Sequence, residues 1–374
     1  MTTAACTPER FQRLLTDTHA AIGYAVRPTP AGGYVVAGSA AFPGQVSPMT
    51  LVDTGADGEP IWAAPIGSSV MGWATHVVPV VGGELVACGT ELPNPPGPPQ
   101  LLALSQVDAA GAVEWHRVLA ALPPGSNESA ECQGLEPALD GGYRLIWKLN
   151  QAPPGQTARV WVLATDAAGA EIWRHPIEGG VSGPAALTVT PDGHTIVAAT
   201  TSLLEVRLLD LDATGNEQWT RTYASSVFRG AVITSIDGTQ DGAFFLVGSI
   251  VSPLTHVTAA ALIKIDRAGS IVWTRYPSDF DGDTVISDGV HGLYGGYAAV
   301  GWQLAPESGC LLVKTSDAGE VEWSRLFGPP GVARGCTSVR STRDGGFVFT
   351  GLYSPGDMYL VKTDSTGDAG PPPA

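Results

Sequence analysis

Charged residues are scarce in this 374-residue sequence: Asp, Glu, Lys and Arg together make up only 15%. Basic residues are the scarcer kind, 20 against 36 acidic ones, so the formal net charge is −16. A surface with this excess of negative charge repels the phosphates of nucleic acids and the headgroups of anionic lipids. We therefore expect neither nucleic acid nor a membrane as a partner.

The sequence also lacks any apolar run close to the roughly 18 residues that a membrane-spanning helix requires. Its start, MTTAACTPERFQRLL, contains neither the basic segment nor the apolar segment of a secretory signal. We expect a cytoplasmic protein if Met1 is the natural start, and an extracytoplasmic protein if a signal peptide has been removed.

Cysteines are few and widely spaced, at positions Cys6, Cys88, Cys132, Cys310 and Cys336. They form no Cys-x-x-Cys pair, and their odd number leaves one unpaired whatever the connectivity. The sequence therefore argues against a disulfide framework, and we expect buried or loop thiols.

Catalytic motifs are missing as well: there is no Gly-x-Ser-x-Gly, His-Glu-x-x-His or phosphate loop to indicate a reaction.

Glycine and proline are abundant, with 47 and 30 residues, which suits many short strands joined by tight turns. Six segments read Gly-x-x-x-Trp, with intervals of 53, 58, 46, 54 and 50 residues between successive tryptophans. Self-similarity at this period indicates a repeat protein. The six motifs end at Trp62, Trp115, Trp173, Trp219, Trp273 and Trp323.

A second marker, a glycine turn followed by a short apolar run, occurs seven times at the same period. Such turns place residues at positive φ, which glycine tolerates best, and they join antiparallel strands. Each repeat therefore reads as four strands, a to d, with a glycine turn between a and b and the Gly-x-x-x-Trp segment opening strand d. The turns are Ala31-Gly-Gly, Val81-Gly-Gly, Asp140-Gly-Gly, Asp192-Gly-His, Asp241-Gly-Ala, Tyr294-Gly-Gly and Asp344-Gly-Gly.

A unit of about 50 residues is too small to be stable alone, so the copies must stack around an axis. The sequence predicts an all-β fold: one seven-bladed β-propeller of four-stranded antiparallel blades, spanning residues 1–374. The predicted blades cover residues 20–67, 70–122, 130–179, 184–226, 229–279, 283–329 and 335–367.

The last repeat has no tryptophan strand after Gly367, whereas the N-terminus has a strand to spare. Residues 9–15, ERFQRLL, match residues 321–327, VEWSRLF, with Phe11 in the position of the tryptophan. We therefore predict that residues 9–15 pair with the strand around residues 359–363 and complete the last blade, which removes an open sheet edge.

The repeat, in which Gly-Gly-Tyr-Val-Val-Ala-Gly is followed by a Lys-Thr-Asp strand and then Gly-x-x-x-Trp, resembles bacterial quinoprotein-like and related uncharacterised propellers. The Asp-x-x-Gly-x-x-x-Trp part is similar to the tryptophan docking motif of pyrroloquinoline quinone dehydrogenases. That resemblance implies eight blades, adjacent cysteines and a metal-binding acid cluster, and the sequence has neither the eighth blade nor a Cys-Cys pair. We therefore expect no pyrroloquinoline quinone.

The b-to-c and d-to-a connections vary in length while the glycine turns stay short, an arrangement typical of a binding face. We therefore predict a site on that face near the axis. Aligning the a strands across blades places charged residues around the central channel, where two guanidinium groups could grip a carboxylate or phosphate. A water-filled channel with internal salt bridges is the alternative. The predicted ligand-binding residues are Arg27, Asp237, Arg340, Trp73 and Trp302.

An enzyme would use the same pocket, with a histidine as general base and a carboxylate as its partner. The candidates are His291, His76, Asp288 and Glu136. Separately, the segment Asp279-Phe-Asp281-Gly-Asp283 offers alternating carboxylates of the kind that Ca²⁺ prefers, or is simply a solvated acidic loop.

The leading hypothesis is a monomeric propeller that binds a small molecule or a peptide. An enzyme of the lyase, hydrolase or isomerase type, as in natural-product tailoring, is the first alternative, and a structural scaffold without a pocket is the second.

Overall fold

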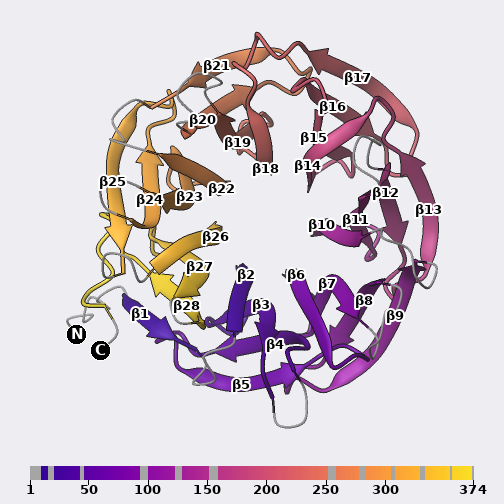
Figure 1. The fold of residues 1–374 in the computed structure, drawn as a ribbon, viewed down its shortest axis with the longest axis vertical. Coiled ribbons are helices and arrows are strands. Elements are labelled where there is room, and N and C mark those ends of the chain that lie inside the picture. The colour runs from indigo at the N-terminus through magenta and orange to yellow at the C-terminus, as the bar shows by residue number, and fades with distance from the viewer. Residues whose placement is uncertain are drawn as a thin grey trace, which may run out of the picture.

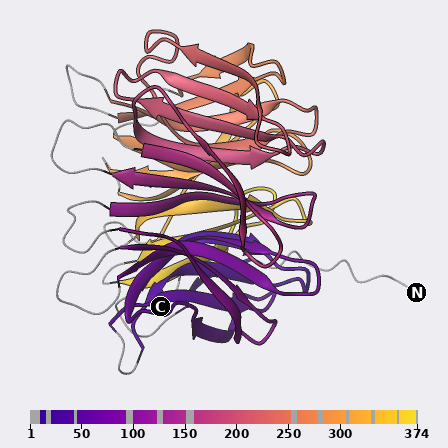
Figure 2. The same cartoon turned by 90° about the vertical axis from the view of Figure 1, so that its right-hand side faces the viewer.

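The computed structural model describes residues 10–15, 21–42, 46–92, 100–122, 129–150, 159–251, 258–277, 283–304, 308–328, 333–353 and 356–372. Seven four-stranded antiparallel sheets stand around a central axis, as predicted (Figure 1). Viewed from the side, the strands run from one face of the disc to the other (Figure 2). Among the described residues there is no helix that could cross a membrane.

The first four blades follow the chain in order. Their strands are β2 (Ala21–Pro28), β3 (Tyr34–Ala40), β4 (Met49–Thr54) and β5 (Pro60–Pro65); β6 (Met71–Pro79), β7 (Leu85–Leu92), β8 (Leu101–Val107) and β9 (Val113–Ala121); β10 (Ser129–Pro137), β11 (Tyr143–Asn150), β12 (Arg159–Thr165) and β13 (Glu171–Pro176); β14 (Val181–Val189), β15 (Thr195–Thr201), β16 (Val206–Leu211) and β17 (Glu217–Tyr223).

The last three blades continue the pattern, and the seventh takes its outermost strand from the N-terminus. Their strands are β18 (Val232–Gly238), β19 (Phe244–Val251), β20 (Thr258–Ile265) and β21 (Ile271–Arg275); β22 (Thr284–His291), β23 (Tyr297–Gln303), β24 (Gly309–Thr315) and β25 (Val321–Phe327); β26 (Ala333–Ser341), β27 (Phe347–Tyr353), β28 (Asp357–Lys362) and β1 (Phe11–Leu14).

The chain ends close the ring as the sequence predicts. Strand β1 pairs antiparallel with β28, with Phe11 opposite Lys362 and Leu14 opposite Tyr359. The Tyr359 hydroxyl donates to the side-chain oxygen of Gln12, whose amide nitrogen donates to the Gly370 carbonyl at 2.7 Å. The first and last segments of the chain therefore hold each other in place, and β28 has no open edge.

The repeated tryptophans lie on the glycines of the next blade. A β-carbon on Gly111, which has φ of +83°, would stand 2.7 Å from the Trp62 ring, and the Trp62 indole donates to the Ala109 carbonyl at 3.0 Å. Phe11 takes the same position against Gly58, whereas Gly269 meets Arg221 and Tyr223 instead of a tryptophan. The other pairs are Trp115 with Gly169, Trp173 with Gly215, Trp273 with Gly319 and Trp323 with Gly367.

Two disulfides correct the expectation of free thiols. Cys88 of β7 is bonded to Cys132 of β10, and Cys310 of β24 to Cys336 of β26, so each bridge joins neighbouring blades. The partners are 44 and 26 residues apart in sequence, but stacking of the blades brings their Cα atoms to 6.2 and 5.2 Å. An odd cysteine count and wide spacing do not reveal contacts that only the ring creates.

Candidate functional site

Strands β2, β6, β10, β14, β18, β22 and β26 are the innermost strand, strand a, of each blade and surround the axis (Figure 1). The a–b and c–d hairpins lie on one face of the disc, here called the hairpin face. The b-to-c and d-to-a connections lie on the opposite face, here called the loop face. Side chains of the a strands that point inward meet at the axis, because alternate residues of a strand share one side.

Every strand a carries an irregularity at the same level. In six blades it is a β-bulge, a single residue with no partner on strand b, and in β14 the register shifts between Val181 and Ala185. All six bulged residues line one axial cavity. They are Tyr24, Thr75, Gln133, Thr234, Ser287 and Thr337. Bulges redirect side chains beside many active sites, and here they crowd polar groups into the channel.

The axial cavity has a volume of about 100 Å³ and receives residues from all seven blades. That is room for several water molecules or for a small polar group of a larger ligand. The predicted residues Arg27, His76, Glu136, Asp288 and Arg340 all line it, whereas Asp237, His291, Trp73 and Trp302 do not.

The two arginines of the cavity each have a carboxylate partner. Arg27 Nη2 lies 2.8 Å from Glu136 Oε1, and Arg340 Nη1 lies 2.7 Å from Asp288 Oδ2. Arg27 is 8% exposed, and its Nη1 is buried without a hydrogen-bond partner in the protein. A buried guanidinium nitrogen with an unused donor is costly unless water or a ligand accepts its hydrogen bond. Arg27, one of the residues that line the cavity, therefore has one unmet donor.

Asp288 is the most fully bonded acid of the site. Its carboxylate accepts hydrogen bonds from the Ser235 hydroxyl at 2.6 Å and from the backbone N–H groups of Gly289 and Val339 at 2.9 and 3.0 Å. Burial nevertheless raises its pKa, against the opposing effects of these bonds and of Arg27. With Arg340 also bound to it, this carboxylate is fixed in place and serves as a wall of the cavity.

The other two acids also have raised pKa values. Burial raises the pKa of Glu136, although Arg27 opposes the change. Burial raises the pKa of Asp237 to about 7, and the charges of Glu136 and Asp288 add to this effect; a hydrogen bond of 2.8 Å from the His291 backbone N–H to Asp237 Oδ2 opposes it. Burial therefore favours the protonated, uncharged form of all three acids.

The two histidine candidates, His76 and His291, lie in different surroundings. His76 lines the cavity, and burial together with the positive charge of Arg27 lowers its pKa to about 3. The imidazole of His291 instead packs edge-on against Tyr297, with ring centroids 5.3 Å apart. Asp288 and His291 are three residues apart on β22 and so lie on opposite sides of the strand. The structure does not bring His291 and Asp288 into one pocket.

The tryptophan and metal candidates lie elsewhere. Trp302 is 39% exposed and packs against Gly335, where a β-carbon would stand 2.8 Å from its ring. Asp279 and Asp281 lie outside the described residues. Asp283 Oδ1 accepts the Thr258 backbone N–H at 2.7 Å, a contact that joins two segments.

The charged residues sit closer to the hairpin face than the sequence analysis placed them. Arg27, Glu136, Asp237 and Arg340 are each the second-last residue of strand a, next to the glycine turn. Val78 and Val290 occupy this level in β6 and β22. The small number of residues between each charged residue and its glycine turn can be read from the sequence, and it predicts a position near the hairpin face.

Asp288 and His76 lie one level farther from the hairpin face than Arg27, on the same side of their strands. Each stands immediately after the bulged residue of its strand, as Ser235 and Ser338 do in their blades. Arg27, by contrast, stands three residues after the bulged residue Tyr24, on the same side of its strand and one level nearer the hairpin face.

The arrangement defines the class of this protein as a seven-bladed β-propeller with a polar axial cavity. No protein-family model matches the chain, and a search of curated proteins finds no match either. Among solved structures the chain is similar to YCF48 bound to D1 peptide, with 12% identity over 99% of both chains and a TM-score of 0.55.

Two further solved structures show the same fold. The chain is 10% identical to the BP39L lectin from Burkholderia pseudomallei, with 94% of this chain and 98% of the lectin covered and a TM-score of 0.55. It is 14% identical to puromycin hydrolase, with a TM-score of 0.59; 97% of this chain is covered but only 56% of the hydrolase. At these identities the likeness establishes the fold alone.

Proposed function

We propose that this protein is a binding propeller that holds a small polar ligand, or the polar end of a peptide, in its axial cavity. The observation that carries the proposal is the buried, unmet donor Arg27 Nη1, on a side chain that lines a cavity with polar groups from six of the seven blades. Structures with this fold include one bound to a peptide and a lectin, which agrees with a binding role.

The chemistry of the lining restricts the ligand. A guanidinium only donates hydrogen bonds, so the ligand must present an acceptor oxygen, such as a carbonyl or a carboxylate, to Arg27. In the lining, Arg27 pairs with Glu136 and Arg340 pairs with Asp288, so opposite charges stand side by side in both pairs. A neutral or zwitterionic ligand fits this balance better than a multiply charged anion.

The same cavity gives less support to the alternative that this protein is an enzyme. His76 is the histidine that shares the cavity with carboxylates, and its pKa of about 3 makes it a poor proton acceptor at neutral pH. A general base works best when its pKa lies near the working pH. Binding without chemistry is therefore the function that this cavity supports best.

The test is a binding screen of the oxidised, metal-free protein with short peptides, free amino acids and simple sugars, followed by calorimetry. We expect Arg27→Gln and Glu136→Gln to weaken binding of the best ligand at least ~10-fold, the equivalent of about 1.4 kcal/mol. Arg267→Gln is the matched control. Like Arg27, Arg267 pairs with a carboxylate, Asp192 at 3.1 Å, and has a buried Nη1 without a partner, but it lies outside the cavity.

Equal affinities for the wild type and both cavity variants would overturn the proposal. Loss of affinity in Arg267→Gln as well would mean that the effect comes from folding.

A further inference from the structure

The two disulfides have the same mechanical role but different surroundings. Both join neighbouring blades, and Cys132 and Cys336 occupy equivalent positions, each the last residue before the bulge of its strand a. In the part of the chain that the structure describes, a histidine stands beside the first bridge alone: His76 pairs with Cys88 across strands β6 and β7. Among the described residues, no other group of three ligating side chains comes as close together as His76, Cys88 and Cys132.

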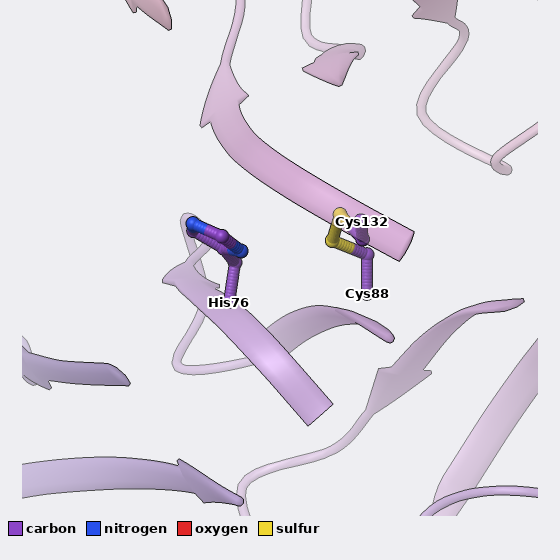
Figure 3. Close-up of side chains that lie close together, drawn as sticks. All are labelled: His76, Cys88 and Cys132. Atoms are coloured by element: carbon purple, nitrogen blue, oxygen red, sulfur yellow. A yellow bond between two sulfur atoms is a disulfide. The ribbon is translucent and has the colours of Figure 1, made fainter. Parts of the chain in front are cut away.

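The three side chains are close enough to share one ion. A ring nitrogen of His76 and the two sulfurs lie within 4.8 Å of one another (Figure 3). Around a tetrahedral Zn²⁺, with Zn–S of about 2.3 Å and Zn–N of about 2.0 Å, ligand atoms stand roughly 3.5 to 3.8 Å apart. Small side-chain rotations would therefore bring the nitrogen in and let the sulfurs separate once the bond between them is broken.

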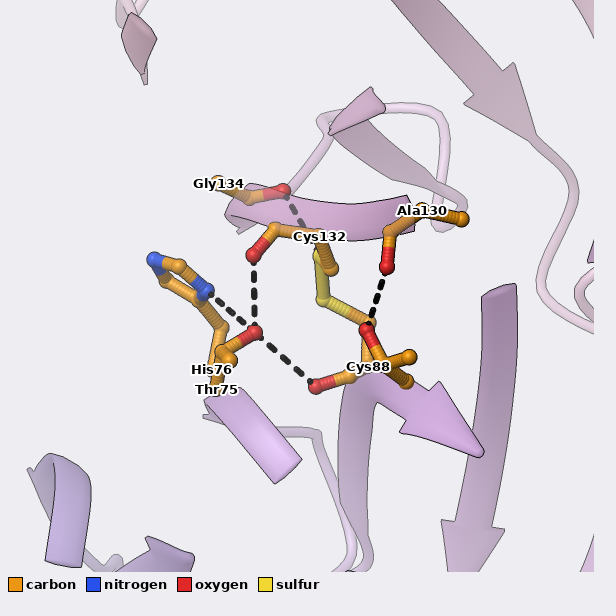
Figure 4. The surroundings of a disulfide bond; sticks show 7 residues. Thr75, His76, Cys88, Ala130, Cys132 and Gly134 are labelled. Atoms are coloured by element: carbon orange, nitrogen blue, oxygen red, sulfur yellow. Dashed lines mark hydrogen bonds between the residues drawn. A yellow bond between two sulfur atoms is a disulfide. The ribbon is translucent and has the colours of Figure 1, made fainter. Parts of the chain in front are cut away.

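The surroundings already hold the three residues in position. The Thr75 hydroxyl donates to the Cys132 carbonyl at 2.8 Å and lies 3.2 Å from His76 Nδ1, so it ties the histidine strand to the next blade (Figure 4). Cys88 and Cys132 are 0% and 2% exposed, and His76 lines the axial cavity. Neighbouring groups of this kind orient metal ligands and strengthen binding.

We propose that reduction of Cys88–Cys132 converts this wall of the cavity into a metal site, in which two thiolates and the His76 imidazole bind a borderline-soft divalent cation of the Zn²⁺ type. In the redox step a thiol or phosphine reductant supplies two electrons, the S–S bond breaks, and two protons from solvent or the reductant give two thiols. Each thiol then releases its proton when the ion binds.

Charge and coordination both favour this ion. Two thiolates neutralise a divalent cation, so the loaded site adds no net charge beside Arg27. Thiolate and imidazole ligands select Zn²⁺ over Ca²⁺ or Mg²⁺, which prefer oxygen. Three protein ligands leave the fourth tetrahedral position free, and because His76 lines the cavity, that position is available to water or to an acceptor atom of a bound ligand.

The experiment uses the full chain, folded and purified with a phosphine reductant and titrated with Co²⁺ as a spectroscopic probe, followed by competition with Zn²⁺. We expect one Co²⁺ per chain with the near-ultraviolet charge-transfer absorption of thiolate ligation, and no binding to the oxidised protein. His76→Ala should weaken Co²⁺ binding at least ~10-fold. The double variant Cys310→Ser/Cys336→Ser, which removes the other inter-blade bridge, should bind Co²⁺ as the wild type does.

Three results would overturn the proposal: no thiolate–cobalt absorption in the reduced wild type, equal affinity in His76→Ala, or loss of binding in the Cys310→Ser/Cys336→Ser variant. Circular dichroism checks that the reduced chain folds, and failure to fold would also reject the site. Ligand binding by the oxidised, metal-free protein is measured separately, so the two proposals can fail independently.

Discussion

At the residue scale, the indole of Trp62 lies on a glycine of the next blade that leaves no room for a β-carbon. Trp62→Ala removes this contact and the hydrogen bond to Ala109, and we expect a loss of about 3–5 kcal/mol in the free energy of unfolding. Trp302→Ala, at a side chain 39% exposed, should cost clearly less. Chemical denaturation measures both, and equal losses would contradict the different roles assigned to these tryptophans.

The opposite side of the same contact gives an independent test. Gly111→Ala places a β-carbon against the Trp62 ring and forces a side chain onto a residue with φ of +83°. We expect destabilisation of at least ~1 kcal/mol, and a smaller loss when Trp62→Ala is already present, since the clash is then gone. If the losses in free energy of unfolding add strictly in this double-mutant cycle, residues 62 and 111 are not in energetically significant contact.

Asp237 sets a pH dependence of stability. Its pKa of about 7 in the folded protein lies above the ~3.9 of an unfolded chain, so the folded state binds the proton more tightly. This contribution to stability is complete below about pH 4 and is lost as the pH rises through 7. Asp237→Asn keeps an acceptor for the His291 N–H, so the variant should be more stable than the wild type at pH 8, with a flatter profile of thermal midpoint against pH. Parallel profiles would contradict this assignment.

At the scale of elements, the closing strand β1 completes the last blade. Deleting residues 1–16 removes β1, exposes the edge of β28 and takes Phe11 away from Gly58. We expect a loss of several kcal/mol or aggregation, because unpaired strand edges recruit other chains. Deleting residues 1–8 leaves β1 intact and serves as the control. Equal thermal midpoints and monomer content for the two truncations would contradict closure by β1.

The strands themselves could be predicted from the sequence because each is bracketed by local signals. Glycine turns and the Gly-x-x-x-Trp spacing mark both hairpins of the first six blades, and the match of Phe11 to the tryptophan position identifies β1 as the outer strand of the seventh. The bulges leave no such mark, since any residue can occupy them. They place Asp288 and His76 directly after the unpaired residue of the strand, one level farther from the hairpin face than Arg27.

At the scale of the whole molecule, each of the two disulfides connects consecutive blades through cysteines that are 44 and 26 residues apart in sequence, a pairing that local patterns do not reveal. Loops of 44 and 26 residues closed in this way contribute roughly 3 to 4 kcal/mol each by restricting the unfolded chain. Because such bridges persist in oxidising compartments, we propose the extracytoplasmic alternative for this chain.

Thiol titration of the denatured protein, recovered from an oxidising compartment, checks the two bridges. Two disulfides among five cysteines leave one reactive thiol, which we expect before reduction, and all five should react after it. Five reactive thiols before reduction would contradict both bridges.

The central claim is that the axial cavity binds a polar ligand through Arg27, and a crystal structure of the protein with the best ligand from the screen tests it most directly. We predict density for the ligand in the cavity, with an acceptor oxygen within about 3 Å of Arg27 Nη1. Ligand bound elsewhere on the ring, with water alone beside Arg27 and Glu136, would contradict the claim.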